Sequence, residues 1–288
     1  MGDITNLVAF TLAIGASFFW ALAQLIGKMA MRELNSTLLN TIRISFIAAA
    51  LTPVVMITGL EFGGDFPIIL ALVSGVFGIY ASSQVFFYTI KRSQAHVATT
   101  VSNSSPVWTV IFALFLLSEG MTATLPFSLA FVIGGSLLFV PRNLGPSNWK
   151  RAVPFATIVA SLWGFDQMLR KWCINLGMGS LTFLWLALVF ASLLFSLNAL
   201  AKKSWRGHSF SRRNVGLALA CGLSGQLLGT FLHISSIGLE KVSAIAPVTT
   251  AAIPFGFLMS IFMFQEKPNA RSWIGMALVF AGVFLAAF

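Results

Sequence analysis

The chain has 288 residues, of which 57% are hydrophobic and only 9% are charged, and its formal net charge is +10. Soluble domains carry about 25% charged residues, so this composition excludes a water-soluble globular protein and indicates an integral membrane protein. The positive charge falls in short turns between apolar runs, where it sets membrane orientation, and this distribution argues against nucleic acid as a partner.

Ten apolar runs follow one another along the chain. A spanning helix needs about 20 apolar residues, so ten helices with short loops account for the whole length. The predicted spans are 7–31, 37–59, 67–90, 95–117 and 122–140 in the first half, and 152–174, 181–200, 215–238, 242–264 and 272–288 in the second. A basic linker containing Pro and Gly, 141–151, joins the halves. We therefore expect an all-α membrane protein with ten transmembrane helices.

The two halves, 1–144 and 145–288, repeat one another. The pattern Trp, three residues, Gln, three residues, Lys occurs as Trp20–Gln24–Lys28 and again as Trp163–Gln167–Lys171. Spans four and nine each carry a proline and end in a glutamate, which are Pro106 with Glu119 and Pro254 with Glu266. Because five spans is an odd number, the second half enters the membrane in the opposite direction. Two inverted five-helix repeats are typical of secondary transporters.

The lysines and arginines predict the orientation. The turns after spans one, three, five, seven and nine hold Lys28, Arg32, Lys91, Arg92, Arg142, Lys150, Arg151, Lys202, Lys203, Arg206, Arg212, Arg213, Lys267 and Arg271, whereas the opposite side holds Arg170, Lys171 and Lys241. The positive-inside rule places the more basic side in the cytoplasm. Both termini are therefore expected outside a cytoplasmic (inner) membrane.

Polar and aromatic residues inside the predicted spans are the candidates for a solute cavity. They are Trp20, Gln24, Tyr80, Gln84, Tyr88, Asn103, Trp108, Trp163, Gln167, Gln226 and His233. A polar group facing lipid lacks a partner, so these side chains should face the interior of the bundle. Aromatic faces mixed with amides suit a small organic solute that is largely uncharged or zwitterionic. The alternative is that the polar groups join helices by hydrogen bonds.

Two charged residues and two prolines have open roles. Asp166 either carries a proton or contacts a cation, or it forms a structural ion pair with Arg170 one turn on. Arg43, in span two, either binds an anionic group of the solute or extends to lipid phosphate; the second half has no counterpart of it. Pro106 and Pro254 free backbone carbonyls in mid-helix, which either places these helices beside a cavity or produces a packing kink.

These residues resemble the drug/metabolite transporter superfamily, in particular its ten-span EamA-type members. The resemblance rests on Trp20 with Lys28, on Arg43, and on Pro106 leading to Leu117-Ser118-Glu119; the second half repeats it with Trp163, Lys171, and Pro254 leading to Phe264-Gln265-Glu266. It covers nearly the whole chain. It implies a basket-like bundle with a cavity lined by spans one, three, four, six, eight and nine, and with spans five and ten at the periphery or at a dimer contact.

The expected function is alternating-access transport of a small organic solute, with amino acids or related metabolites as the first choice and export as one option. Sugars or nucleotide derivatives are alternative substrates, and a non-transporting assembly or receptor subunit is an alternative class. The chain lacks H-E-x-x-H and G-x-S-x-G, so we expect no enzyme, no metal and no cofactor. The expected partners are the solute and the bilayer, with the protein a monomer or a homodimer.

Overall fold

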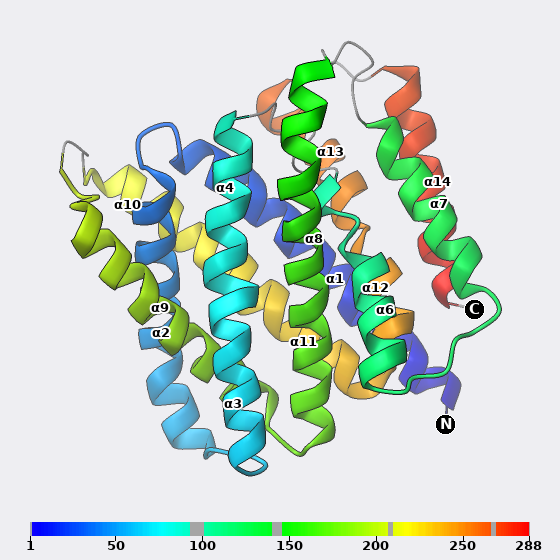
Figure 1. Ribbon diagram of the computed structural model, residues 1–288, viewed down its shortest axis with the longest axis horizontal. Helices are drawn as coiled ribbons and strands as arrows, with labels where there is room; N and C mark the ends of the chain where they lie inside the picture. Colours follow the sequence, from blue (N-terminus) through cyan, green and yellow to red (C-terminus); the bar gives the residue numbers. More distant parts are fainter. Residues whose placement is uncertain (1, 93–100, 140–145, 207–209, 266–268, 288) are drawn as a thin grey trace.

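The computed structural model describes residues 2–92, 101–139, 146–206, 210–265 and 269–287, and every element in these ranges is helical (Figure 1). The helices of the first half are α1 (Gly2–Ala30), α2 (Ser36–Thr58), α3 (Asp65–Val73), η1 (Ser74–Ala81), α4 (Ser82–Arg92), α6 (Ser105–Leu116) and α7 (Leu125–Leu138). Those of the second half are α8 (Pro146–Asn175), α9 (Ser180–Lys202), α10 (Arg212–Cys221), η2 (Gly222–Gly229), α11 (Thr230–Leu239), α12 (Val242–Thr249), α13 (Ala252–Phe264) and α14 (Ala270–Ala287).

Within the part of the chain that the structure describes, six helical stretches are long and apolar enough to cross a membrane. They are Ile4–Ala30, Ser36–Thr58, Asp65–Phe86, Ser180–Lys202, Arg212–Leu239 and Val242–Phe264. Three shorter apolar helices accompany them, namely Ser105–Leu116, Leu125–Leu138 and Ala270–Ala286. The all-helical, multi-pass architecture expected from the sequence is therefore present, while the number of ten spans stays a prediction.

The third helix of each half contains a π-helical segment at its centre. In the first half, η1 continues α3 into α4, and in the second half η2 continues α10 into α11. Each segment has eight residues, and η2 begins 148 residues after η1. A π-helical turn widens the helix locally and often marks a functional position. The sequence gave no expectation of either segment, because the apolar pattern continues through both.

The helices that carry Pro106 and Pro254 are interrupted rather than kinked. Turns at 103–104 and 250–251 precede α6 and α13, so each proline lies in the first turn of a new helix. Proline has no N–H to donate and its ring clashes with the carbonyl four residues earlier, whereas a first helical turn tolerates it, which accounts for the break. The expectation of mid-helix prolines in 95–117 and 242–264 was wrong to that extent, and residues 95–100 lie outside the described ranges.

The linker was also predicted too long. The chain was expected to stay non-helical from 141 to 151, whereas α8 already begins at Pro146. Proline fits the first helical position because its missing N–H would have no partner there. The helix therefore starts earlier than its apolar stretch does.

The two halves interlock instead of lying side by side. The segment from α3 to η1 packs against α8 and α9, and the segment from α10 to η2 packs against α1 and α2. In the same way α6 packs on α8 while α13 packs on α1, and α2 packs on α9. Each half therefore supplies the neighbours of the other half's third helix, and the main core cluster, which includes Ile44, Ile47, Phe183 and Leu188, joins both.

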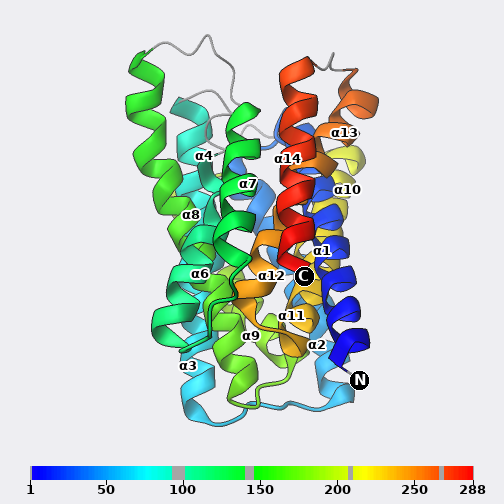
Figure 2. The same cartoon turned by 90° about the vertical axis from the view of Figure 1, so that its right-hand side faces the viewer.

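The helices α7 and α14 pack against one another at one end of the bundle and run in opposite directions (Figures 1 and 2). A Cβ on Gly135 would lie 2.7 Å from the carbonyl oxygen of Gly275, and Ser128 Oγ donates a 2.7 Å hydrogen bond to the carbonyl of Gly282. Gly275 follows Ser128 by 147 residues, and Gly282 follows Gly135 by the same 147 residues. The contact therefore repeats itself under exchange of the two helices, as an antiparallel twofold relation requires.

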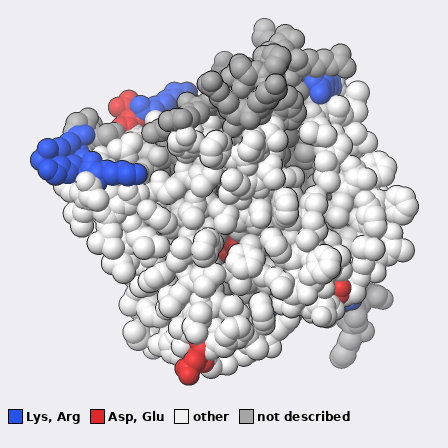
Figure 3. Space-filling view, in the orientation of Figure 1, with Lys and Arg blue, Asp and Glu red and all other residues white. Residues whose placement is uncertain are grey.

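Charge is distributed unevenly between the two ends of the molecule. In Figure 3 the blue residues gather along the upper edge, a red cluster lies at the lower edge, and most of the face between them is white. The exposed basic residues from the end of α9 to the first turn of α10 are Lys202, Lys203, Arg206, Arg212 and Arg213. An uncharged band between charged ends is the surface that a bilayer requires.

Candidate functional site: a polar network and paired tryptophans inside the bundle

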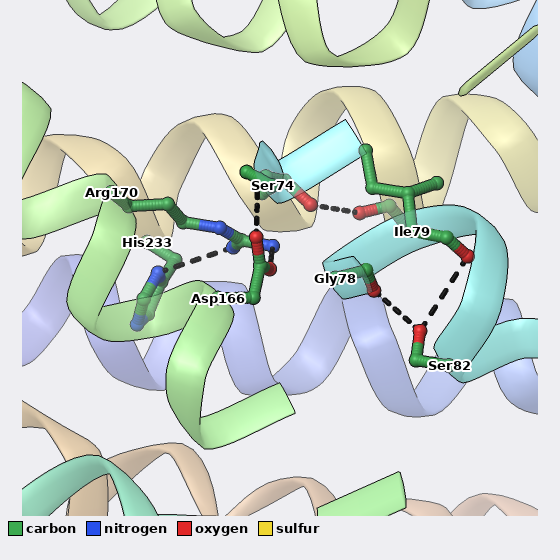
Figure 4. A network of polar contacts seen from close by, with 9 residues as sticks. Ser74, Gly78, Ile79, Ser82, Asp166, Arg170 and His233 are labelled. Atoms are coloured by element: carbon green, nitrogen blue, oxygen red, sulfur yellow. Dashed lines mark hydrogen bonds and ion pairs between the residues drawn. The ribbon is translucent and has the colours of Figure 1, made fainter. Parts of the chain in front are cut away.

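A chain of polar contacts links the two halves in the interior (Figure 4). Asp166, on α8, accepts hydrogen bonds from Ser74 Oγ of η1 and from Arg170 Nη2 one turn further along α8. Asp166 is only 2% exposed, so its charge depends on these donors for compensation. Of the two interpretations open from the sequence, the ion pair with Arg170 is present in the structure.

Glycine makes room for this carboxylate. A side chain at Gly78, one turn after Ser74 in η1, would overlap Asp166. Ser82 Oγ donates a 2.5 Å hydrogen bond to the carbonyl of Gly78, one of the backbone groups of the π-helical segment. The local sequence Ser74–Ser82 therefore provides both a hydroxyl for the carboxylate and a close approach of η1 to α8.

His233, on α11, extends the network. Its Nδ1 lies 3.5 Å from Arg170 Nη1, and the side chain has no exposed surface. Because a guanidinium cannot accept a hydrogen bond, Nδ1 is the acceptor in this contact, which leaves Nε2 as the second polar atom of the ring. That Nε2 has no partner among the described residues.

The tryptophans of the repeated motif occupy equivalent positions in the two halves. The ring of Trp20 lies 5.1 Å from that of His233 at a tilt of 42°, and the ring of Trp163 lies 5.3 Å from that of Phe86 at 49°. His233 follows Phe86 by 147 residues, as Trp163 follows Trp20 by 143. Each motif tryptophan therefore stacks on the same position of the opposite half's third helix.

The glutamines behave differently from one another. Gln167 is buried and its Oε1 has no hydrogen-bond partner in the described part of the chain, and the same holds for Nε2 of the half-buried Gln84. Gln24, the counterpart of Gln167, is exposed. Unsatisfied buried polar atoms are uncommon in folded proteins and cost about 1–3 kcal/mol each, so Gln84, Gln167 and His233 are the positions where an added ligand would gain most.

The remaining candidates have other described contacts. Tyr80 packs edge-on against Phe195 with ring centroids 4.9 Å apart, and the exposed Tyr88 packs in the same way against Phe155 at 5.2 Å. Trp108 lies 6.3 Å from Phe112, next to Gly164. Asn103, in the turn before α6, and Gln226, in η2, are both partly buried.

Arg43 lies apart from the Asp166 network. Its Nε donates to Asn40 Oδ1 at 2.8 Å and its Nη1 lies 3.5 Å from Cys221 Sγ. Neither partner carries a negative charge. Arg43 is partly exposed, on the second turn of α2, while Asn40 and Cys221 are buried.

Sequence reasoning missed Ser74, Gly78 and Phe86. Serine and glycine are common in membrane helices, and nothing in the sequence marks these copies as special. The one available signal was the repeat itself, because aligning the halves pairs Phe86 with His233 and Gly78 with Gly225. Among the described residues, no three His, Cys, Asp or Glu side chains come close enough to hold a metal ion.

An all-helical, multi-pass bundle whose halves interlock and enclose polar groups is the architecture found in membrane transporters of the inverted-repeat class. The sequence matches the model of the EamA-like transporter family twice, over residues 7–140 and 150–288. The chain belongs to the EamA-like transporter family, which confirms the resemblance found from the motifs.

Two further similarities agree with this assignment. Over 177 residues the chain is 29% identical to the Drosophila melanogaster protein named "Solute carrier family 35 member B1 homolog"; the match covers 60% of this chain and 46% of that relative, so the chain spans about half of its length. A solved structure described as "Crystal structure of protein" superposes with a TM-score of 0.77 at 16% sequence identity, covering 96% of both chains. The latter similarity shows the fold alone.

Proposed function

We propose that this transporter moves a small organic solute across the cytoplasmic (inner) membrane by alternating access, through a central region lined by the motif tryptophans and the buried amides. Amino acids or related metabolites are the first choice of solute, and export is one direction that the mechanism permits. The observation that carries the proposal is the reciprocal stacking of Trp20 on His233 and of Trp163 on Phe86. An inverted twofold relation lets the two halves exchange conformations, which opens opposite sides in turn.

The protein consists of two five-helix repeats, 1–144 and 145–288, which move relative to one another, and both termini lie outside the cell. The antiparallel course of α7 and α14 and the basic residues between α9 and α10 support this arrangement. Single cysteines placed at Ile4 and at Trp205 of a variant with Cys173 and Cys221 replaced by serine test it. A membrane-impermeant maleimide applied to intact cells should label the first position and leave the second unlabelled; the reverse pattern contradicts the orientation.

Transport itself is tested in proteoliposomes with radiolabelled amino acids, sugars and nucleotide derivatives. We expect saturable flux for at least one solute, and we expect Trp20→Ala and Trp163→Ala to reduce it strongly. Trp205→Ala is the matched control, because Trp205 is 39% exposed in the segment after α9 and lies outside both motifs in the sequence. Correctly inserted protein without saturable flux for any member of the panel would count against the proposal.

A non-transporting assembly or receptor subunit is the competing function, and it requires no water-filled path. Gln24→Cys and Gln167→Cys distinguish the two in the same cysteine-free background. Labelling of the buried position 167 by a small water-soluble thiol reagent, increased or protected by solute, supports transport. Position 167 staying unlabelled under all conditions supports the alternative.

A further inference from the structure

The pseudo-twofold relation between the halves shows that the carboxylate of Asp166 has no counterpart in the first half, where the equivalent residue is Ala23. The residues around the ion pair have counterparts in the other half. At a separation of 147 residues, Ser74 corresponds to Cys221 and Gly78 to Gly225. At a separation of 143 residues, Asp166 corresponds to Ala23 and Arg170 to Gly27. The contacts match as well as the numbers. Asp166 lies against Gly78, and Ala23 lies against Gly225, where an added Cβ would be 2.7 Å from the alanine methyl group.

The guanidinium of Arg43 lies at the position that is equivalent, under the pseudo-twofold relation, to the Asp166–Arg170 ion pair. Cys221 Sγ is 3.3 Å from the carbonyl oxygen of Ala23, 3.4 Å from the Cβ position of Gly27 and 3.5 Å from Arg43 Nη1. Its counterpart Ser74 binds Asp166, which in turn binds Arg170. An arginine therefore reaches both equivalent places, from α8 in one half and from α2 in the other.

Among the described residues, a carboxylate is present at one of these places only. Arg170 has Asp166, whereas the described contacts of Arg43 are to the neutral Asn40 and Cys221. An arginine within an apolar bundle is costly without a counter-charge, because its hydration is lost and its five N–H donors need acceptors. Arg43 is partly exposed, so the residue is not fully enclosed and an anion can approach it.

We infer that Arg43 is the binding residue for an oxyanion, a carboxylate or a phosphate, which takes the place that Asp166 fills in the other half, above Ala23 and Gly27. The inference deepens the proposed function and rests on it where the oxyanion belongs to the solute; a zwitterionic solute would bring its carboxylate here. The other source of the same chemistry is an anionic lipid headgroup. Arginine suits both, since its planar fork pairs with two oxygens at once.

A double-mutant cycle tests the geometry without knowledge of the solute. Ala23→Asp should restore the missing carboxylate, so we expect the melting temperature of purified protein to be maintained or raised. In an Arg43→Gln background the same substitution should lower it sharply, because the new carboxylate is buried without a partner. Ala21→Asp is the matched control on the same helix and should be equally harmful in both backgrounds. Equal losses for Ala23→Asp in both backgrounds would overturn the inference.

Anion titrations then separate the two sources. Delipidated protein in a neutral detergent is melted while chloride is replaced by acetate or inorganic phosphate at constant ionic strength, and in a second series dioleoyl phosphatidylglycerol is added instead. A rise in melting temperature with acetate or phosphate identifies a soluble oxyanion, and a rise with phosphatidylglycerol alone identifies the lipid. In Arg43→Gln the half-saturating concentration should increase about tenfold, as expected for a lost charge-assisted pair; Arg212→Gln is the control.

A response that is unchanged in Arg43→Gln, or no response to any of the three anions in the wild type, would overturn the anion site. Transport is judged separately by saturable flux in proteoliposomes. A protein that transports but shows neither the anion response nor the coupling between positions 23 and 43 refutes this inference alone. A protein that shows both but has no flux refutes the proposed function and leaves the anion site in place.

Discussion

Trp20 of α1 stacks on His233 of α11, and its indole also lies against Gly229, four residues before His233. A Cβ on Gly229 would lie 2.6 Å from Cδ1 and 2.8 Å from Nε1 of the indole. The position of the tryptophan thus depends on the absence of a single methyl group.

We predict that Gly229→Ala displaces the indole from His233 and reduces solute flux, while the protein still folds. Tryptophan fluorescence should shift in the same variant, because the environment of Trp20 changes. Gly216→Ala is the control, since an added Cβ there meets nothing within 4 Å. Normal flux together with an unshifted spectrum would contradict the predicted displacement of the ring.

The Asp166 network predicts a large effect on stability. Asp166→Asn leaves Arg170 buried without a counter-charge, and we expect a loss of about 3–5 kcal/mol in the free energy of unfolding. Adding Arg170→Met should recover part of the loss, because the unpaired charge is then removed. Thermal unfolding of the two single variants and the double variant measures the coupling; strictly additive losses would contradict a direct pair.

The contact between α7 and α14 predicts that alanine substitutions at the adjacent glycines Gly134 and Gly135 have different effects on stability. Gly135→Ala places a methyl group 2.7 Å from the backbone of Gly275, so we expect a loss of about 1–3 kcal/mol from overpacking. Gly134→Ala meets nothing within 4 Å and should be neutral or slightly stabilising through its better helix propensity. Comparison of the two melting temperatures is the measurement, and equal values would mean that the helices can separate freely.

Glu119 predicts a capping effect at α12. Its carboxylate accepts hydrogen bonds from the backbone N–H groups of Val242 and Ser243, at 3.1 and 2.9 Å, and from Ser243 Oγ at 2.6 Å. Glu119→Gln removes the charge that faces the positive end of the helix, and we expect a loss of about 1 kcal/mol. Glu33→Gln, at an exposed position beyond α1, is the control for the change in net charge. No difference between the two variants in chemical unfolding would exclude the cap.

The repeat and the transporter class could be predicted because they depend on spacing, which the sequence displays directly. Trp20 and Trp163, or Glu119 and Glu266, recur at nearly constant separation, and inversion follows from the odd number of predicted spans in each half. The residues on which the motif tryptophans stack were not predicted. Phe86 is one of 28 phenylalanines in the chain, and only the folded structure places it beside Trp163.

Local backbone geometry was the part that hydropathy could not reveal. A π-helical segment has the same apolar content as an α-helix, so η1 and η2 were read as ordinary helix. The breaks before α6 and α13 were read as kinks because the apolar runs continue across them. The residue before the repeated glutamate has a positive φ in both halves: 53° at Ser118, before Glu119, and 54° at Gln265, before Glu266. A pattern of side chains does not predict this backbone conformation.

The exchange of neighbours between the halves also determines when the molecule can fold. During synthesis the segment from α3 to α4 enters the membrane before α8 and α9 have been made. The glycine face of η1 therefore lacks its packing partners until α8 and α9 are inserted. The early helices therefore wait in the bilayer, loosely associated, and the final structure forms only after the last of its partners has been inserted. A chain cut at the linker would yield two fragments that must associate before either of them reaches its final structure.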